Sequence, residues 1–236
     1  MSLPTADGAP GSPKPAILCL HGGGTNTIIF NVQLIRIQRA LASHFDFVFL
    51  DGPYESGPGP DVLPVFEGCG PYRSWISEFF QKEKPPLTKD LLEKTLEEQR
   101  AKDGRGFVGV LGFSQGVRVG AGLLLEQQVR RREDGNGLAF GVFCNGTRPP
   151  LTSGLSEEER REIIAFPTLH VIGLQDPWRD EGRKMFLEHF DGNLGTIVEF
   201  DIGHRLPLLE QDTARIAEEI LRMHQKTSCQ IQANVP

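Results

Sequence analysis

Six short apolar runs, separated by longer segments with the period of amphipathic helices, constrain the fold of this 236-residue chain more than any other feature. The runs are continuous in apolar character rather than alternating, as expected for strands that are covered on both faces. Their alternation with helices is the pattern of βαβ units and predicts a mostly parallel sheet. The six runs are residues 16–20, 47–50, 107–111, 139–144, 168–172 and 196–200.

The segments between these runs supply the helices that such a sheet needs. Candidate helices cover residues 28–43, 87–102, 115–132, 179–190 and 209–226. We therefore expect an α/β fold, with a twisted sheet of about six strands and helices on both faces. One domain would occupy residues 14–226, between a disordered N-terminal tail at 1–13 and a C-terminal tail at 227–236.

Composition excludes several classes of partner. The formal net charge is -6 with both signs interspersed, so no basic stripe is available for nucleic acid or for anionic lipid. No window approaches the roughly 18 apolar residues of a membrane span, and the N-terminus lacks the apolar core of a secretory signal. Two of the four cysteines, Cys19 and Cys144, lie in expected buried strands, and no pair has metal-ligand spacing. Reduced thiols are typical of a cytoplasmic protein, and the cysteine spacing predicts no metal site.

The stretch Gly112-Phe-Ser-Gln-Gly116 directly follows the third apolar run and opens a helical segment. A strand, a tight turn and a helix around one serine form the layout of a nucleophile elbow. The turn needs strained backbone dihedrals and leaves no room for side chains near the serine, which explains both glycines. Ser114 is therefore the candidate nucleophile, and it needs a histidine base and oxyanion donors from elsewhere in the chain.

The base is expected after the last strand, and His204 alone among the six histidines occupies that position. The acid is expected in the loop after the preceding strand, where Asp176 lies. Asp180 competes for this role, but its position at the start of the next helix favours a capping function. Asp201 lies too close to His204 along the chain to face it easily. The expected triad is Ser114, Asp176 and His204.

An oxyanion hole requires two N–H donors, one of them from the residue after the nucleophile, Gln115. The second is expected from Gly23, in the glycine-rich turn that follows the first strand. Such a turn could instead hold phosphate, but it matches neither a Walker A sequence nor Gly-x-Gly-x-x-Gly. His21 is expected to shape this turn, and a direct contact with substrate remains open.

Residues 52–72 contain five glycines and five prolines, too many for a regular element. Long ordered loops are usually functional, so the region 52–102 is expected to form a lid or acyl pocket. Aromatic side chains gather in and near it, although some of them could belong to the core. The expected substrate contacts are His21, Phe66, Tyr72, Trp75, Phe79 and, beside the acid, Trp178.

With these residues in place, the chain resembles the fungal serine hydrolase family of the α/β-hydrolase superfamily, and within it the stand-alone thioesterases and hydrolases of polyketide pathways. The resemblance covers about residues 14–226. It rests on the segments Ile17-Leu-Cys-Leu-His-Gly22, Thr25-Asn26, Phe49-Leu-Asp-Gly-Pro53, Gly112-Phe-Ser-Gln-Gly116 and Gly203-His204 with Leu206-Pro207, together with Asp176.

The resemblance implies a compact α/β hydrolase that releases an acyl group from the carrier domain of a polyketide synthase, or hydrolyses a related ester. It implies no cofactor. Gly23 stands where relatives carry a larger residue, which affects pocket shape but not backbone donation. Acyl-protein thioesterases and small carboxylesterases share Gly-Phe-Ser-Gln-Gly and provide the second hypothesis, although a further glycine usually follows there and Val117 stands here. A binding module that keeps the fold without catalysis is the third.

Overall fold

A six-stranded parallel sheet forms the centre of the computed structural model, which describes residues 13–78, 81–130 and 137–233. The strand order is β2-β1-β5-β6-β7-β8, and every neighbouring pair is parallel. The strands are β1 (Ala16–Leu20), β2 (Asp46–Leu50), β5 (Phe107–Phe113), β6 (Phe140–Cys144), β7 (Thr168–Gly173) and β8 (Gly195–Phe200). The six apolar runs of the sequence are therefore the six strands of this sheet, and the predicted fold class is confirmed.

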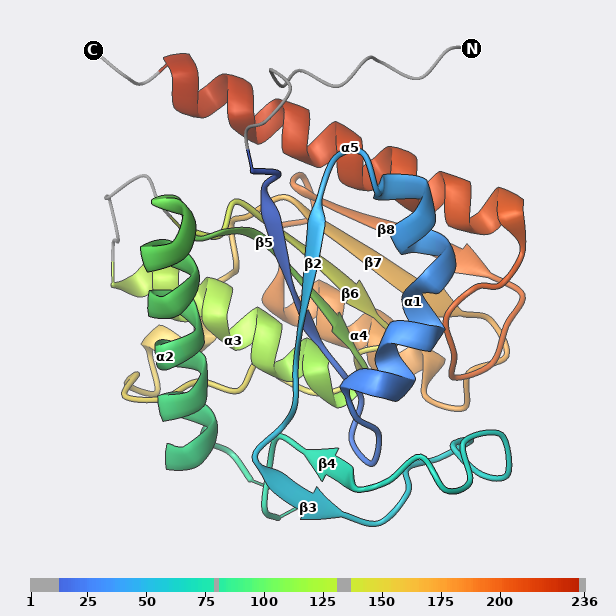
Figure 1. Ribbon diagram of the computed structural model, residues 1–236. Helices are drawn as coiled ribbons and strands as arrows, with labels where there is room; N and C mark the ends of the chain where they lie inside the picture. The colour runs from blue at the N-terminus through green and yellow to red at the C-terminus, as the bar shows by residue number, and fades with distance from the viewer. Residues whose placement is uncertain (1–12, 79–80, 131–136, 234–236) are drawn as a thin grey trace.

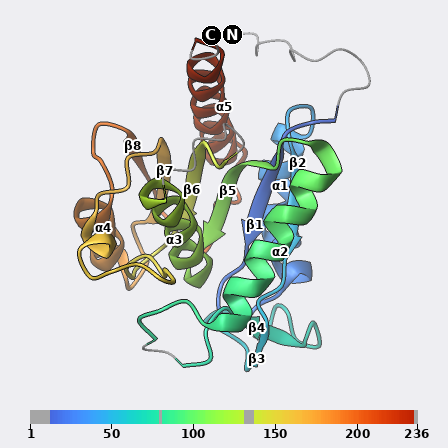
Figure 2. The same ribbon diagram turned by 90° about the vertical axis from the view of Figure 1, so that its left-hand side faces the viewer.

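Helices cover both faces of the sheet, as expected. Buried side chains of α1 and α5 pack with one face, and those of α2, α3 and α4 pack with the other. Figure 2 shows α2 and α3 in front of the sheet and α1 behind it. The helices are α1 (Thr27–Leu41), α2 (Pro86–Asp103), α3 (Gln115–Val129), α4 (Arg179–His189) and α5 (Glu210–Ala233).

Local sequence accounts for where α1 begins and which of its faces is buried. Asn26 adopts an extended conformation, and its side-chain oxygen accepts a hydrogen bond from the N–H of Ile29 at 2.9 Å, as an N-cap residue does. The buried positions then follow the helical period. They are Ile29, Phe30, Leu34, Ile37 and Leu41.

The last helix is longer than the sequence predicted. We expected it to end at residue 226, but α5 continues to Ala233, so the predicted tail at 227–236 is wrong for residues 227–233. Thr227 is buried and donates its hydroxyl to the carbonyl of Met223 at 3.1 Å. No glycine or proline interrupts residues 210–233, and therefore nothing local stops the helix. The other predicted tail falls almost wholly on residues 1–12, outside the described residues.

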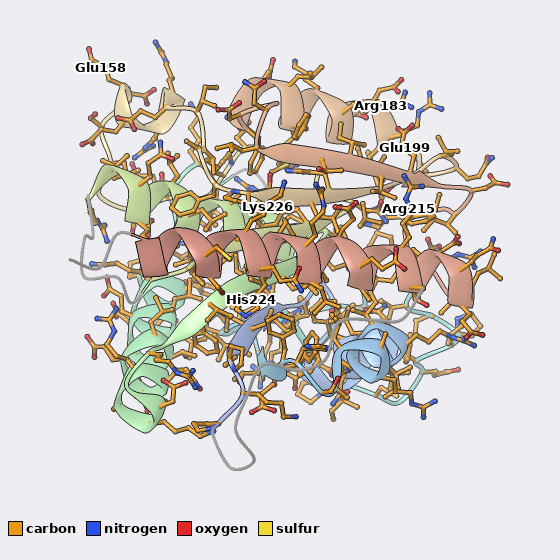
Figure 3. All side chains as sticks on the ribbon, turned by 90° about the horizontal axis from the view of Figure 1, so that it is seen from above. Glu158, Arg183, Glu199, Arg215, His224 and Lys226 are labelled. Carbon is orange, nitrogen blue, oxygen red and sulfur yellow. The ribbon has the colours of Figure 1, made fainter. Side chains whose placement is uncertain are left out.

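Side-chain contacts join α4 and α5 to the rest of the domain. Figure 3 labels Arg183 of α4 and Glu199 of β8, which form an ion pair with 2.6 Å between Nη2 and Oε1. The same view labels His224 of α5, whose ring lies 4.9 Å from that of Phe45. His224 therefore packs on the core, while Arg215 on the same helix is exposed.

Two short strands that the sequence did not reveal lie between β2 and α2. The strands β3 (Tyr54–Ser56) and β4 (Tyr72–Ser74) pair antiparallel, so the expectation that residues 52–72 hold no regular element is wrong at both ends. Three residues are too few for a readable alternation of polar and apolar positions. Figure 1 shows this ribbon beyond one end of the main sheet, the end at which β1 finishes.

Candidate active site

The nucleophile elbow is present at the exit of β5. Ser114 has φ 50° and ψ −113°, a strained conformation for a residue with a side chain, and α3 begins at the next residue. A Cβ atom on Gly116 would lie 2.1 Å from the carbonyl oxygen of Leu20, and one on Gly112 would lie 2.7 Å from the Gly116 carbonyl carbon. Both glycines are therefore required by close approach of backbone to backbone.

Ser114, His204 and Asp176 form a continuous hydrogen-bonded row. Nε2 of His204 lies 2.9 Å from Oγ of Ser114, and Nδ1 lies 2.7 Å from Oδ2 of Asp176. The carboxylate can only accept, so the proton belongs on Nδ1 and Nε2 is free to accept the serine hydroxyl. The other carboxylate oxygen accepts the N–H of Trp178 at 2.9 Å, which fixes the orientation of the acid. Asp176 and His204 are both buried.

Neither of the competing acids is bonded to His204. Asp180 is exposed in the first turn of α4 and forms an ion pair with the guanidinium of Arg179 at 3.0 Å. Asp201 is exposed and accepts a hydrogen bond from Gln175 at 2.9 Å. The structure thus brings together the three residues that the sequence singled out and leaves both competitors outside.

Next to the hydrogen-bonded row of Ser114, His204 and Asp176, two backbone N–H groups make no hydrogen bond to a carbonyl. The hydrogen bonds among the described residues leave the N–H of Gly23 and that of Gln115 without an acceptor. Gln115 is the first residue of α3, where the helix dipole is positive. These are the two donors that the sequence predicted for an oxyanion hole.

The turn that carries Gly23 is held by the segment between β2 and α2. The N–H of Gly24 donates to the carbonyl of Arg73 at 2.9 Å, and the N–H of Arg73 donates to the carbonyl of Thr25 at 2.6 Å. From the loop between β3 and β4, the N–H of Gly59 donates to the carbonyl of Gly24 at 2.9 Å. The part of residues 52–102 that contains Gly59 and Arg73 is therefore hydrogen-bonded to the turn that carries Gly23.

The side-chain amide of Gln115 packs against Gly23, so the residues that carry the two N–H donors are in contact. Its Oε1 accepts hydrogen bonds from the N–H of Trp75 at 2.7 Å and the hydroxyl of Ser74 at 3.1 Å. The amide then lies over Gly23, because a Cβ atom there would come within 2.9 Å of Nε2. A larger residue at position 23 would displace the Gln115 amide, which gives a physical reason for glycine at this position.

His21 and Trp75 are core residues, so the predicted direct contacts with substrate are wrong for both. Each is fully buried, and their rings lie 5.0 Å apart. Nε2 of His21 accepts the N–H of Gly52 at 2.9 Å, and the indole N–H of Trp75 donates to the His21 carbonyl at 2.8 Å. Burial lowers the pKa of His21, which keeps the ring neutral. The alternative role for His21, shaping the turn, agrees with these bonds.

The other predicted substrate contacts occupy three kinds of position. Trp178 is 39% exposed, and its ring stands edge-on to that of His204 at 4.9 Å. Phe66 and Tyr72 are half-buried, and the Tyr72 hydroxyl donates to the Phe66 carbonyl at 2.9 Å, which braces the loop. Phe79 lies outside the described residues. Among the predicted substrate contacts that the structure describes, Trp178 is thus the one whose ring lies against the hydrogen-bonded row.

One residue of the site was missed by sequence reasoning. Asn145 follows β6 with φ 51°, and its side chain accepts the N–H of Gly173 at 2.9 Å and donates to the carbonyl of Arg205 at 3.0 Å. It therefore joins the exits of β6 and β7 to the loop that carries His204. The available signal was an asparagine directly after an apolar run, because asparagine tolerates positive φ better than most residues.

A parallel sheet with a nucleophile elbow, a histidine after its last strand and a carboxylate after the preceding one defines an α/β-hydrolase. Comparison with known families then identifies the branch. Residues 11–216 match the family described as Serine hydrolase (FSH1), and the chain belongs to it. The protein is therefore an enzyme of the serine hydrolase type.

Curated relatives cover nearly the whole chain. "Esterase FUS5" of Gibberella fujikuroi is 37% identical over 225 residues, which span 91% of this chain and 89% of that protein. "Thioesterase FSL2" of Gibberella zeae is 34% identical over 231 residues, which span 88% of this chain and 91% of that protein.

Solved structures share the fold at much lower identity. A carboxylesterase from Mesorhizobium loti matches with a TM-score of 0.57 and 14% identity, over 88% of both chains. Acyl-protein thioesterase 2 of Zea mays matches with a TM-score of 0.57 and 15% identity, over 91% of this chain and 96% of that one.

Two further classes of feature are not found in the described part of the chain. Among residues 13–78, 81–130 and 137–233, no group of three or more His, Cys, Asp or Glu side chains could hold a metal ion. Within the same residues, every helix is too short or too polar to cross a membrane.

Proposed function

We propose that this protein hydrolyses an acyl ester or thioester through Ser114, His204 and Asp176. The observation that carries the proposal is the row of two hydrogen bonds, 2.9 Å and 2.7 Å long, that joins these side chains. The Ser114 hydroxyl attacks the acyl carbonyl carbon while its proton passes to Nε2 of His204. Asp176 stabilises the imidazolium that forms and keeps the ring in the required tautomer.

The tetrahedral oxyanion that follows would be held by the N–H groups of Gly23 and Gln115. Support comes from their lack of carbonyl partners and from the position of Gln115 at the positive end of α3. Collapse of this intermediate expels the alcohol or thiol, which takes the proton from His204. Water then attacks the acyl-enzyme with His204 as base, releases the acid and restores Ser114. None of these steps requires a metal or an organic cofactor.

The substrate that we propose is a polyketide acyl chain on the carrier domain of a synthase. The resemblance to the stand-alone hydrolases of polyketide pathways supports it, as does the presence of a thioesterase among the relatives. Trp178, exposed beside His204, offers an apolar surface next to the reacting carbonyl. Cleavage of a simple oxygen ester is the second candidate, because another relative at similar identity is named an esterase.

We further propose that the enzyme works in the cytoplasm as a single domain. Its four cysteines are free, and Cys19 and Cys144 are buried, which is the usage of a reducing compartment.

Labelling with a fluorophosphonate tests the catalytic proposal, because this reagent reacts only with an activated serine. We expect the wild type to be labelled and Ser114→Ala to be inert, while Ser153→Ala serves as the matched control and is labelled like the wild type. An unlabelled wild type, or equal labelling of Ser114→Ala, would favour a non-catalytic binding module. The substrate is tested separately with carrier-bound acyl thioesters and oxygen esters of the same acyl group. Faster hydrolysis of the oxygen esters would contradict carrier release.

A further inference from the structure

Arg118 is a buried guanidinium whose hydrogen-bond partners are neutral. The residue is only 7% exposed, and its Nε and Nη2 atoms donate to the backbone carbonyls of Pro149 at 3.2 Å and Gln81 at 3.0 Å. No carboxylate of the described residues lies within ion-pair distance of Arg118. Buried charges in proteins are normally paired, because an isolated one loses its hydration without compensation. The arginine therefore lacks the counter-ion that its burial calls for.

A second positive charge lies close to the first. Burial, together with the smaller effect of the nearby positive charge of Arg148, lowers the pKa of Arg118 to about 10. Arg148 is half-buried in the loop that follows β6, so it retains surface toward solvent. Two guanidinium groups that repel each other in a partly desolvated place are stabilised together when an anion lies between them.

This pair of arginines lies at the same end of the sheet as Ser114. Arg118 comes four residues after Ser114, about 6 Å further along the axis of α3, on nearly the same face of the helix. Its guanidinium donates to the carbonyl of Gln81, in the segment between β4 and α2, as well as to that of Pro149. Its partner carbonyl at Pro149 belongs to the loop after β6, and that strand ends at Cys144, whose carbonyl accepts the N–H of Ser114 at 2.9 Å.

We propose that Arg118 and Arg148 form an anion-binding subsite of the proposed acyl hydrolase, which recognises a carboxylate or a phosphate group of the substrate. A carboxylate could belong to the acyl chain, whereas a phosphate could belong to the arm that carries the thioester. Both anions accept two parallel hydrogen bonds from a guanidinium, which gives orientation as well as affinity. The inference rests on the proposed function, since the anion arrives as part of the substrate.

Two matched pairs of substrates test the subsite. The carboxylate pair is p-nitrophenyl valerate and p-nitrophenyl hydrogen glutarate, which differ in a terminal carboxylate. The phosphate pair is S-butyryl pantetheine and S-butyryl phosphopantetheine. We expect the wild type to favour the anionic member of one pair by about 10- to 100-fold in kcat/KM, mostly through KM, which is the usual effect of a charge-assisted hydrogen bond. The pair that shows the preference identifies the source of the anion.

Arg118→Gln should abolish that preference and Arg118→Lys should retain part of it, because lysine keeps the charge without the planar fork. Arg148→Gln should reduce the preference as well, and it provides a second variant in which the carbonyl contacts of Arg118 are kept. Arg215→Gln, at an exposed position of α5 labelled in Figure 3, is the matched control and should behave as the wild type. Loss of a purely structural contact at Arg118 would lower the activity on both members of a pair equally and leave their ratio unchanged.

The subsite is overturned if the wild type shows no preference in either pair, or if Arg118→Gln and Arg148→Gln keep the wild-type ratio. The rate of hydrolysis of the neutral member of each pair is measured separately from the ratio of kcat/KM between the anionic and the neutral member. An enzyme that cleaves the neutral esters without any anion preference retains the proposed function and loses only the subsite. A wild type that cleaves none of the four substrates contradicts the proposed function itself.

Discussion

Alanine at Gly59 should damage catalysis from outside the hydrogen-bonded row of Ser114. A Cβ atom at this position would lie 2.3 Å from the carbonyl oxygen of Gly23, whereas real Cβ atoms essentially never come closer than 3.0 Å. The loop and the turn must therefore separate by at least 0.7 Å. Gly59 does not have positive φ, so alanine can adopt its backbone conformation and the perturbation is limited to this contact.

The magnitude follows from what a displaced oxyanion donor costs. A misplacement of about 1 Å at a reacting centre can lower the rate by about 100-fold, and loss of one donor lowers it by about 100- to 1,000-fold. A shift of 0.7 Å at the Gly23 carbonyl moves the neighbouring peptide without removing the donor. We expect kcat to fall by about 10- to 100-fold, which corresponds to about 1.4–2.7 kcal/mol of lost transition-state stabilisation.

The assay compares kcat and KM for p-nitrophenyl butyrate, with the melting temperature as a check on folding. Gly57→Ala is the matched control, because it lies in the same loop and its added methyl group would meet nothing within 4 Å. The fall should appear in kcat rather than KM, since the oxyanion forms only in the transition state. A folded Gly59→Ala protein with kcat within twofold of the wild type, or an equal loss in Gly57→Ala, would refute the coupling between this loop and the oxyanion turn.

Three further predictions concern the acid, an ion pair and the core. Asp176→Asn should lower kcat by about 1,000- to 10,000-fold, because an amide neither stabilises the imidazolium nor fixes its tautomer, while an equal loss in the control Asp180→Asn would contradict the assignment. Lys84→Met removes the ammonium group that lies 2.8 Å from the buried carboxylate of Glu126. The free energy of unfolding, measured by urea titration, should fall by about 3–5 kcal/mol, because a buried charge is left without its counter-ion. Methionine at both position 84 and position 126 should recover most of this loss. Burial lowers the pKa of His170 to about 3 against about 6.5 in the unfolded chain. The unfolded state therefore binds the proton first, and the stability present above pH 6.5 falls by up to about 5 kcal/mol toward pH 3; an NMR titration that finds His170 protonated in folded protein at pH 5 would disprove this.

Sequence reasoning succeeded where one local pattern implies one structure. The six apolar runs correspond to the strands because a continuous apolar run flanked by helical segments has few other stable arrangements. Once the order of strands is given, Ser114, Asp176 and His204 follow the carboxyl ends of the parallel strands β5, β7 and β8, at one edge of the same sheet, so their convergence follows from topology. The identity of the three residues in the row could therefore be predicted before any coordinates were known.

Sequence reasoning failed where the surroundings of a side chain decide its role. Trp75 directly follows the glycine- and proline-rich residues 52–72 and looks exposed in the sequence, yet it is fully buried, with its indole N–H donating to the carbonyl of His21 and its ring packed on the imidazole. The pairing of β3 with β4 was unreadable for the same reason, since each strand is three residues long and its residues pair with partners 16 to 20 positions away in the chain.

The sequence by itself determined the class of fold, the serine at the elbow and the order in which acid and base follow it, because these depend on short-range patterns and on chain order. Tertiary structure alone decided how the oxyanion turn is held. Gly24 is bonded to Arg73 and Gly59, and the Gln115 amide to Ser74 and Trp75, across separations of 35 to 49 residues. No local propensity encodes such contacts; they arise when the sheet brings the ends of distant strands to one edge.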